Sequence, residues 1–205
     1  MRDIKPVIVL VLLLSSILYA QRDDTANLEI KEKKIIKPLK QELVILGKTK
    51  FKVINKKTQK SHIVDLSNQD FILVSAREHG SDGRFYAVDK DGTVWWSGPV
   101  TSGAPEYRSP SGVFPIIHKK RYHMSTAYPD EHGINNMDFM LKFTRYGHAL
   151  HKGSVDWMSH GCIHIDKKDI PTLFKWANYK TKVVITRHSY MPFAKDDLKK
   201  VYGHW

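Results

Sequence analysis

Residues 71–100 read FILVSAREHGSDGRFYAVDKDGTVWWSGPV and contain the clearest structural pattern in the chain. Runs rich in β-branched and aromatic residues lie at 71–76, 84–89 and 93–100, and HGSDG and KDG separate them. Such glycine- and aspartate-containing segments are turn signals, and short apolar runs between turns are typical of strands. The stretch therefore predicts a succession of short strands and a mostly-β domain.

Further segments toward the C-terminus fit the same fold class. GVFPIIHK (112–119), DFMLKFT (138–144) and KVVITR (182–187) read as strands, and DKKDIPTLFKWANYK (166–180) reads as a helix. In that helix Asp169 is placed to cap the start, and Pro171 suits the first turn. The sequence predicts one or two short helices in a mostly-β domain.

The first twenty residues have the layout of a secretory signal peptide. Arg2 and Lys5 precede an apolar run at 7–14, and small or polar residues follow up to Ala20. The run is shorter than the roughly 20 residues of a membrane-spanning helix. We expect residues 1–20 to be a signal peptide, with an uncleaved anchor as the alternative. The mature protein is then exported to the periplasm or the cell wall, and it contacts the membrane only if the leader stays attached.

Positive charge is concentrated after this leader. The formal net charge is +12, and residues 28–60, with eleven lysines and three glutamates, contribute +8 of it. Such a segment attracts anionic envelope polymers, whereas export disfavours nucleic acid as a partner. The alternative is a solvated basic face that aids solubility. We expect a basic arm with a strand or two at 21–66, the main domain at 67–188 and a C-terminal tail at 189–205, with a helical turn around DDLKKV (196–201).

The only cysteine, Cys162, lies in SHGCIHI (159–165). An odd cysteine in an exported protein indicates intermolecular pairing or a reactive thiol, and the alternative is a buried, inert residue. Residues adjacent on one strand rarely form a linear nucleophile–base hydrogen bond, so a base is expected from a neighbouring strand. His151 in HALHKGS is the candidate. Gly161 has no Cβ, so its backbone can approach substrate or adopt a positive φ angle, as an oxyanion hole requires.

A metal site is the rival interpretation of this histidine-rich region. Zinc binds both imidazole and thiolate. However, the sequence lacks the C-x₂-C pairs of structural zinc sites and the H-E-x-x-H signature of catalytic ones. Residue types and spacing alone leave thiol catalysis, a metal site and a structural role open. The residues concerned are His148, His151, His160, Cys162 and His164.

Residues 141–165, LKFTRYGHALHKGSVDWMSHGCIHI, resemble the catalytic signature of the L,D-transpeptidase (YkuD-type) family, which pairs an upstream histidine with [S/T]-H-G-C. TSGAPEYRSPSGVFPI (101–116) is similar to the family's S-x-G…TP-x-G-x-F segment, and MDFMLKF (137–143) is similar to its M-P-Y-x-x-x-F strand. The resemblance covers about residues 70–187. It implies a β-sandwich-like catalytic domain with mixed sheets.

The resemblance also implies roles for individual residues. Cys162 is the expected nucleophile, and His151 is the expected general base, oriented by the backbone carbonyl of Lys152. His160 and Gly161 are expected to shape the site, with the N–H groups of Gly161 and Cys162 as oxyanion donors. The residues expected to support the loop or contact the substrate are Ser159, His164, Lys152 and Tyr146.

Three positions depart from the family pattern. His164 replaces the usual Arg or Asn, the interval between His151 and Ser159 is short, and Asp138 stands where proline is common. Recognition of a substrate carboxylate at His164 is therefore open, because imidazole is only partly charged near neutral pH. His148 is expected to be a packing residue.

The activity implied by the resemblance is attack on the L,D bond before D-Ala in a peptidoglycan stem tetrapeptide. The acyl group then passes from a thioester to an amine, giving a 3–3 crosslink or anchoring a lipoprotein, or to water, giving L,D-carboxypeptidase trimming. The resemblance implies no metal or cofactor and predicts trapping by carbapenems. The alternatives from other classes are a zinc-dependent hydrolase and a non-catalytic wall-binding protein.

Overall fold

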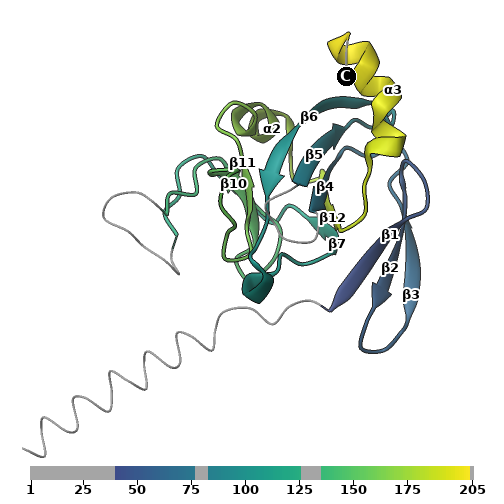
Figure 1. Cartoon of the computed structure of the whole chain (residues 1–205), viewed down its shortest axis with the longest axis horizontal. Helices are drawn as coiled ribbons and strands as arrows, with labels where there is room; N and C mark the ends of the chain where they lie inside the picture. The colour runs from purple at the N-terminus through teal and green to yellow at the C-terminus, as the bar shows by residue number, and fades with distance from the viewer. Residues whose placement is uncertain (1–39, 77–82, 126–134, 204–205) are drawn as a thin grey trace, which may run out of the picture. The chain divides into compact units, whose positions relative to one another are not determined.

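The computed structural model describes residues 40–76, 83–125 and 135–203. The expected signal peptide and residues 21–39 of the expected arm lie outside these ranges. The described residues form a three-stranded sheet, ordered β1-β2-β3, and a nine-stranded sheet, ordered β7-β12-β4-β5-β6-β11-β10-β9-β8 (Figure 1). The predicted mostly-β class is confirmed.

The strands of the smaller sheet are β1 (Gln41–Ile45), β2 (Lys50–Asn55) and β3 (Ser61–Asp65). Those of the larger sheet are β4 (Phe71–Ala76), β5 (Gly83–Val88), β6 (Val94–Thr101), β7 (Gly112–Pro115), β8 (His118–Lys120), β9 (Met140–Lys142), β10 (Ala149–Lys152), β11 (Ile163–Ile165) and β12 (Lys182–Thr186). The helical elements of the described chain are the 3-10 turn η1 (Pro105–Tyr107), α2 (Ile170–Trp176) and α3 (Met191–Tyr202). The larger sheet is mixed, because β12 pairs with β4 and β10 pairs with β11 in parallel.

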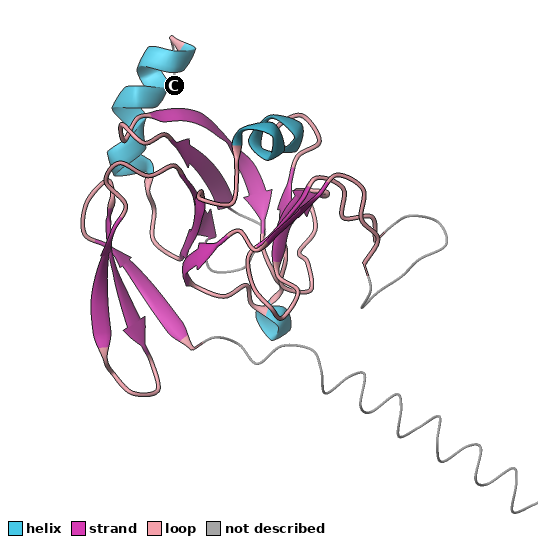
Figure 2. Cartoon of the chain, turned by 180° about the vertical axis from the view of Figure 1, so that it is seen from behind, coloured by secondary structure: helices cyan, strands magenta, loops and turns pink. Residues whose placement is uncertain are grey.

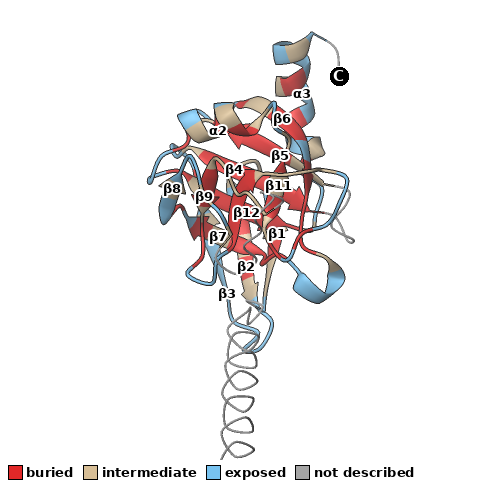
Figure 3. Cartoon of the chain, turned by 90° about the vertical axis from the view of Figure 1, so that its left-hand side faces the viewer, coloured by how far each residue is buried: buried red, intermediate tan, exposed pale blue. Residues whose placement is uncertain are grey.

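The centre of the larger sheet is covered on both faces. Every residue of β4 is buried, and its side chains alternate between two apolar clusters. A strand buried on both faces is expected to be a continuous apolar run, as FILVSA is. One cluster joins Ile72 and Val74 to Leu150, Ile163 and Leu173, and the other joins Phe71 and Leu73 to Phe51 and Leu198. Figure 3 shows the central strands of the larger sheet coloured as buried.

The two helices belong to different clusters and lie apart along the sheet (Figure 2). Helix α2 buries Ile170 and Leu173 in the cluster that also contains β10 and β11. Asp169 precedes it, but the expectation that Asp169 caps the helix is wrong, because its side chain makes no capping bond. Its carboxylate accepts a hydrogen bond from Trp96 Nε1 at 3.1 Å instead, so it ties the helix start to β6.

Helix α3 occupies most of the predicted C-terminal tail, where the sequence suggested only a helical turn. Asp197 accepts hydrogen bonds from the Lys48 ammonium group and, at 2.9 Å, from the Val94 N–H. The helix thereby joins the β2 side of the smaller sheet to β6 of the larger one, and its residue Leu198 is fully buried. Neither described helix combines the length and apolar character needed to span a membrane.

Truncating Leu198 tests whether α3 is an integral part of the domain. We expect Leu198→Ala to lower the free energy of unfolding by about 2–5 kcal/mol, because it removes buried methyl groups and leaves a cavity. Urea unfolding measures the change. The exposed neighbour Lys199→Ala is the control, and equal stability of the two variants would contradict the packing role of the helix.

Candidate active site

The parallel pairing of β10 with β11 brings the sequence-predicted histidine and cysteine segments together. In this ladder His151 lies opposite His164, and Leu150 lies opposite Ile163. Cys162 directly precedes β11, and its sulfur lies 3.8 Å from the carbonyl oxygen of Gly147, just before β10. Because side chains on extended chains alternate, Cys162, His164 and His151 project from the same face of the pair.

The imidazole of His151 is held in one tautomer by the backbone. His151 is buried, and its Nδ1 lies 2.8 Å from the carbonyl oxygen of Lys152, the group that the resemblance implied. A carbonyl oxygen can only accept, so Nδ1 carries the proton and Nε2 has a free lone pair. The ring can therefore take up a proton at Nε2, although its use as a base stays a prediction.

His151 is buried and Cys162 is partly buried, and the resulting desolvation keeps both groups neutral near neutral pH. Desolvation lowers the pKa of His151 to about 3, and the neighbouring His164 contributes to the same shift. Desolvation also raises the pKa of the Cys162 thiol to about 11, against a smaller opposing effect of the Ala149 backbone. Cys162 is thus a thiol and His151 a neutral imidazole at rest, so Cys162, if it is the predicted nucleophile, must lose its proton during attack.

Gly161 has a backbone that other residues cannot easily adopt. Its φ angle is +110°, and a Cβ there would lie 3.3 Å from His148 Nε2 and from the Tyr107 carbonyl oxygen. Its N–H donates to Ser159 Oγ at 3.0 Å, and that hydroxyl donates to the Cys162 carbonyl at 2.6 Å. The Gly161 N–H is therefore engaged rather than available as an oxyanion donor. The Cys162 N–H remains the predicted donor.

Ser109 joins the cysteine loop to the end of β6, a role that the sequence did not suggest. Its buried hydroxyl accepts a hydrogen bond from the Gly103 N–H at 2.9 Å and donates to the Gly161 carbonyl at 2.9 Å. The two glycine backbones are in close contact, since a Cβ on Gly103 would lie 2.8 Å from the Gly161 Cα. The only signal in the sequence was the likeness of the SPSG segment to the family's TP-x-G.

His164 makes contacts within the protein itself. Its Nδ1 lies 3.0 Å from the Ser154 carbonyl oxygen, and its ring centre lies 4.9 Å from that of His151. The hydroxyl of Thr101 bonds the Ser154 carbonyl at 3.2 Å and the Trp157 carbonyl at 2.9 Å. His164 and Thr101 together fix the short loop that borders the site.

The remaining predicted substrate contacts lie around this loop. The Lys152 ammonium pairs with Asp138 at 3.1 Å, which gives the unusual Asp138 a structural role. Tyr146 is exposed beside Gly147, and the exposed His160 packs its ring against Tyr107 with a centre distance of 4.7 Å. Substrate binding by these residues and by the buried Ser159 stays a prediction.

His148 is a packing residue, as expected. It is buried, and its Nδ1 lies 2.8 Å from Thr144 Oγ1, while its Nε2 lies buried against Gly161 with no hydrogen-bond partner among the described residues. Burial lowers its pKa to about 4, so the ring is neutral at neutral pH. Within the ranges that the structure describes, no three His, Cys, Asp or Glu side chains gather as metal ligands would.

Comparison with known proteins agrees with this architecture. A family model for the L,D-transpeptidase catalytic domain, YkuD, matches residues 69–185, more than half of the chain. The chain therefore belongs to the YkuD family of L,D-transpeptidase catalytic domains. A search of curated proteins gave no match.

Solved structures with a similar fold include three L,D-transpeptidases. That of Enterococcus faecium is 18% identical, with 60% of this chain and 55% of that chain covered and a TM-score of 0.47. That of Stackebrandtia nassauensis is 20% identical, with 58% and 57% covered and a TM-score of 0.48. L,D-transpeptidase 3 of Mycobacterium tuberculosis, in complex with a faropenem-derived adduct, is 15% identical, with 72% and 78% covered and a TM-score of 0.45. The chain spans little more than half the length of the first two proteins.

Substituting Ser109 tests the link between the two loops. Ser109→Ala leaves the buried Gly103 N–H and Gly161 carbonyl without their shared partner, so we expect a loss of about 1–3 kcal/mol in the free energy of unfolding. Ser109→Thr keeps the hydroxyl and should lose less. Denaturant unfolding of both variants measures the difference, and equal losses would show that side-chain size rather than the hydroxyl matters.

The pH dependence of thiol alkylation tests the neutral resting pair. Only thiolate reacts, so with a pKa near 11 the rate of Cys162 alkylation by iodoacetamide should rise about tenfold per pH unit from about pH 6 to pH 10. A cysteine peptide of ordinary pKa, about 8.5, is the control and should level off earlier. A plateau for Cys162 near neutral pH would instead indicate a thiolate–imidazolium pair.

Proposed function

We propose that the chain is a cysteine acyltransferase of peptidoglycan, an L,D-transpeptidase that attacks the L,D bond before D-Ala in stem tetrapeptides. Family membership supports an enzyme of this general kind. The observation that carries the proposal is the single thiol of Cys162 beside the strand of His151, whose Nδ1 is held by a carbonyl so that Nε2 is free.

The proposed reaction proceeds through a thioester. The Cys162 sulfur attacks the carbonyl carbon before D-Ala while His151 Nε2 takes up the thiol proton. The oxyanion that forms is stabilised by the Cys162 N–H, and collapse breaks the C–N bond as the imidazolium returns the proton to the departing D-Ala amine. An acceptor amine then attacks the thioester carbonyl and passes a proton to His151, and as the C–S bond breaks His151 returns that proton to the departing sulfur.

Exposed apolar side chains around the sulfur support a large peptide substrate. Trp157 and Met158 in the loop before Ser159 are 70% and 42% exposed, and Tyr146, which directly precedes Gly147, is 54% exposed. Aromatic side chains at a surface are common in peptide-binding sites. We favour an amine from a second stem or from a lipoprotein as acceptor, and water, giving L,D-carboxypeptidase trimming, is the second candidate.

The location and partners follow from the same proposal. A leader at residues 1–20 directs the protein to the periplasm or the cell wall, where stem peptides are found. The basic segment at 21–66 supports attraction to anionic envelope polymers. We propose no nucleic-acid partner and no cofactor.

Removing the thiol tests the proposed reaction. We expect Cys162→Ala to abolish both D-Ala release from tetrapeptide muropeptides and formation of a covalent carbapenem adduct. We expect His151→Ala, which leaves the thiol without a proton acceptor, to slow acylation by about 100-fold or more. Mass spectrometry of the products and of the intact protein measures both effects, and it identifies the acceptor from the mass of each product.

Control measurements separate the alternatives. His118→Ala, at an exposed histidine on β8, should retain the wild-type rate. A zinc-dependent hydrolase would lose activity to a chelator and keep it after thiol alkylation, the reverse of our expectation. Turnover retained in Cys162→Ala would exclude the thioester route, and no turnover in the wild type would favour a wall-binding protein.

A further inference from the structure

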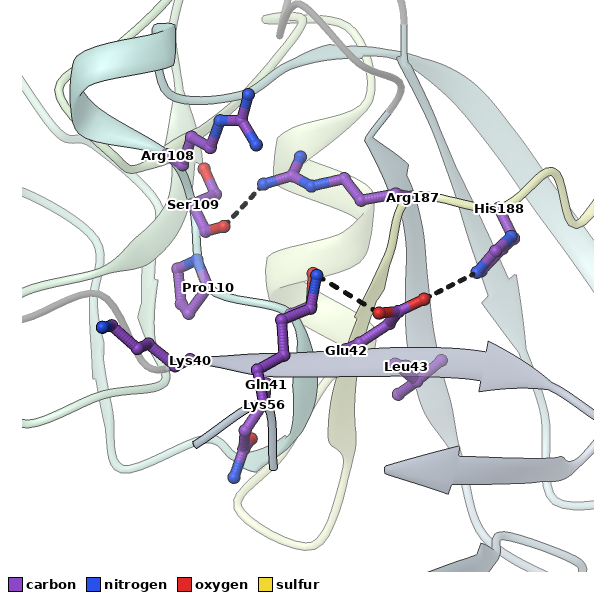
Figure 4. A pocket seen from close by; sticks show the side chains of 11 residues that line it. Lys40, Gln41, Glu42, Leu43, Lys56, Arg108, Ser109, Pro110, Arg187 and His188 are labelled. Atoms are coloured by element: carbon purple, nitrogen blue, oxygen red, sulfur yellow. Dashed lines mark hydrogen bonds and ion pairs between the residues drawn. The ribbon is translucent and has the colours of Figure 1, made fainter. Parts of the chain in front are cut away.

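A hollow of about 350 Å³, whose lining does not include Cys162, lies where the start of β1, the segment after η1 and the end of β12 meet (Figure 4). This volume falls in the range of about 300–1,000 Å³ that is typical of small-molecule sites. The residues that line it are Lys40, Gln41, Glu42, Leu43, Lys56, Arg108, Ser109, Pro110, Ser111, Arg187 and His188.

Two arginines approach each other in this hollow without a carboxylate between them. Arg187 donates from Nη1 to the Ala76 carbonyl at 3.1 Å and from Nη2 to the Ser109 carbonyl at 2.6 Å, so backbone dipoles fix its position but do not neutralise it. Arg108 makes no hydrogen bond or ion pair in the part of the chain that the structure describes. Burial and the positive charge of Arg108 both lower the pKa of Arg187.

The rest of the lining leaves a positive excess. Lys40 and Lys56 add two more cations, and Glu42 is the sole carboxylate among the lining residues. That carboxylate is already engaged, 3.2 Å from the Lys56 ammonium and 4.0 Å from His188 Nε2. Lys40, Arg108 and Arg187 therefore remain unneutralised in the hollow. An anion between the two guanidinium groups would relieve their repulsion.

The size and lining of the hollow indicate which class of ligand it can bind. Pro110 and Leu43 contribute apolar surface, and the space exceeds what a bare inorganic anion fills. Arginine binds a planar carboxylate through parallel N–H donors, which suits a carboxylate that carries a small apolar group. The C-terminal carboxylate of a peptide ending in alanine has this chemistry.

The hollow is also connected to the cysteine loop. Ser109 receives the Arg187 bond on its backbone carbonyl, and its hydroxyl bonds the Gly161 carbonyl. Tyr107, immediately before Arg108, packs its carbonyl against Gly161 and its ring against His160. Residues 107–111 therefore contact the predicted nucleophile loop and also line the hollow.

We propose that this hollow is a second subsite, which binds the C-terminal carboxylate of a peptide between Arg108 and Arg187. That the peptide is a peptidoglycan stem rests on the proposed function, whereas recognition of the carboxylate does not. The subsite would hold a stem other than the one that reacts at Cys162.

Binding measured without turnover tests the subsite independently of the reaction. The Cys162→Ala protein is titrated with N-acetyl-trialanine, with the same peptide as its C-terminal amide, and with inorganic phosphate, while ¹H–¹⁵N spectra are recorded. We expect the free acid to shift the amide signals of Arg108, Ser109 and Ser111, and to bind at least about tenfold more tightly than the amide, because only the acid makes charge-assisted bonds.

Arg108→Gln in the same background should weaken binding of the acid by about tenfold or more and should leave the amide unaffected. Lys90→Gln, which removes an exposed charge elsewhere, is the matched control and should bind as the parent does. Equal affinity for acid and amide, tighter binding of phosphate, or shifts confined to residues around position 162 would each overturn the proposal. Because Cys162→Ala cannot form a thioester, failure of the proposed reaction would not produce any of these results.

Discussion

The register between β10 and β11 is the constraint on which the candidate site depends. Residues along a strand alternate between faces, so a slip of one residue would turn His151 away from Cys162. The apolar residues of the two strands prevent such a slip, because Leu150, Ile163 and Ile165 are fully buried in the cluster beneath α2. Core packing thus determines which polar side chains meet above it.

Near Cys162, serine hydroxyls form the hydrogen bonds to backbone groups that neighbouring strands form elsewhere in the sheet. The loop at 159–162 and the segment at 101–111 are largely outside regular strands, so their peptide groups need other partners. Ser159 and Ser109 supply them by bonding Gly161 and Cys162, and Gly103 allows the backbones to touch. This explains why the region is rich in serine and glycine although it lies against the core.

The sequence predicted the elements that depend on neighbouring residues, and it missed those that depend on contacts between distant segments. The run at 71–100 was read correctly because β4 is a continuous apolar run buried on both faces, and the sequence places glycine- and aspartate-containing segments between the apolar runs. Helix α3 was read only as a turn, because its stability comes from Leu198 and Asp197 contacting distant strands. Asp169 was read as a cap, since nothing local reveals that Trp96 offers its indole N–H. The carbonyl bond to His151 was implied by the family resemblance, whereas the engagement of the Gly161 N–H and the role of Ser109 depend on tertiary contacts.

The burial that fixes the geometry also sets the chemical state of the site. The same loss of water raises the pKa of the Cys162 thiol and lowers that of His151, so assembly of the pair makes both groups less ionic rather than more. A thiol in this state is slow to oxidise, because oxidants attack the thiolate. If the protein is exported as proposed, a lone cysteine must persist in an oxidising compartment, and a neutral resting thiol meets that need. In the proposed reaction the thiol is activated only when peptide is bound, because bond formation between sulfur and the peptide carbonyl and proton transfer to His151 would occur together, without a free thiolate.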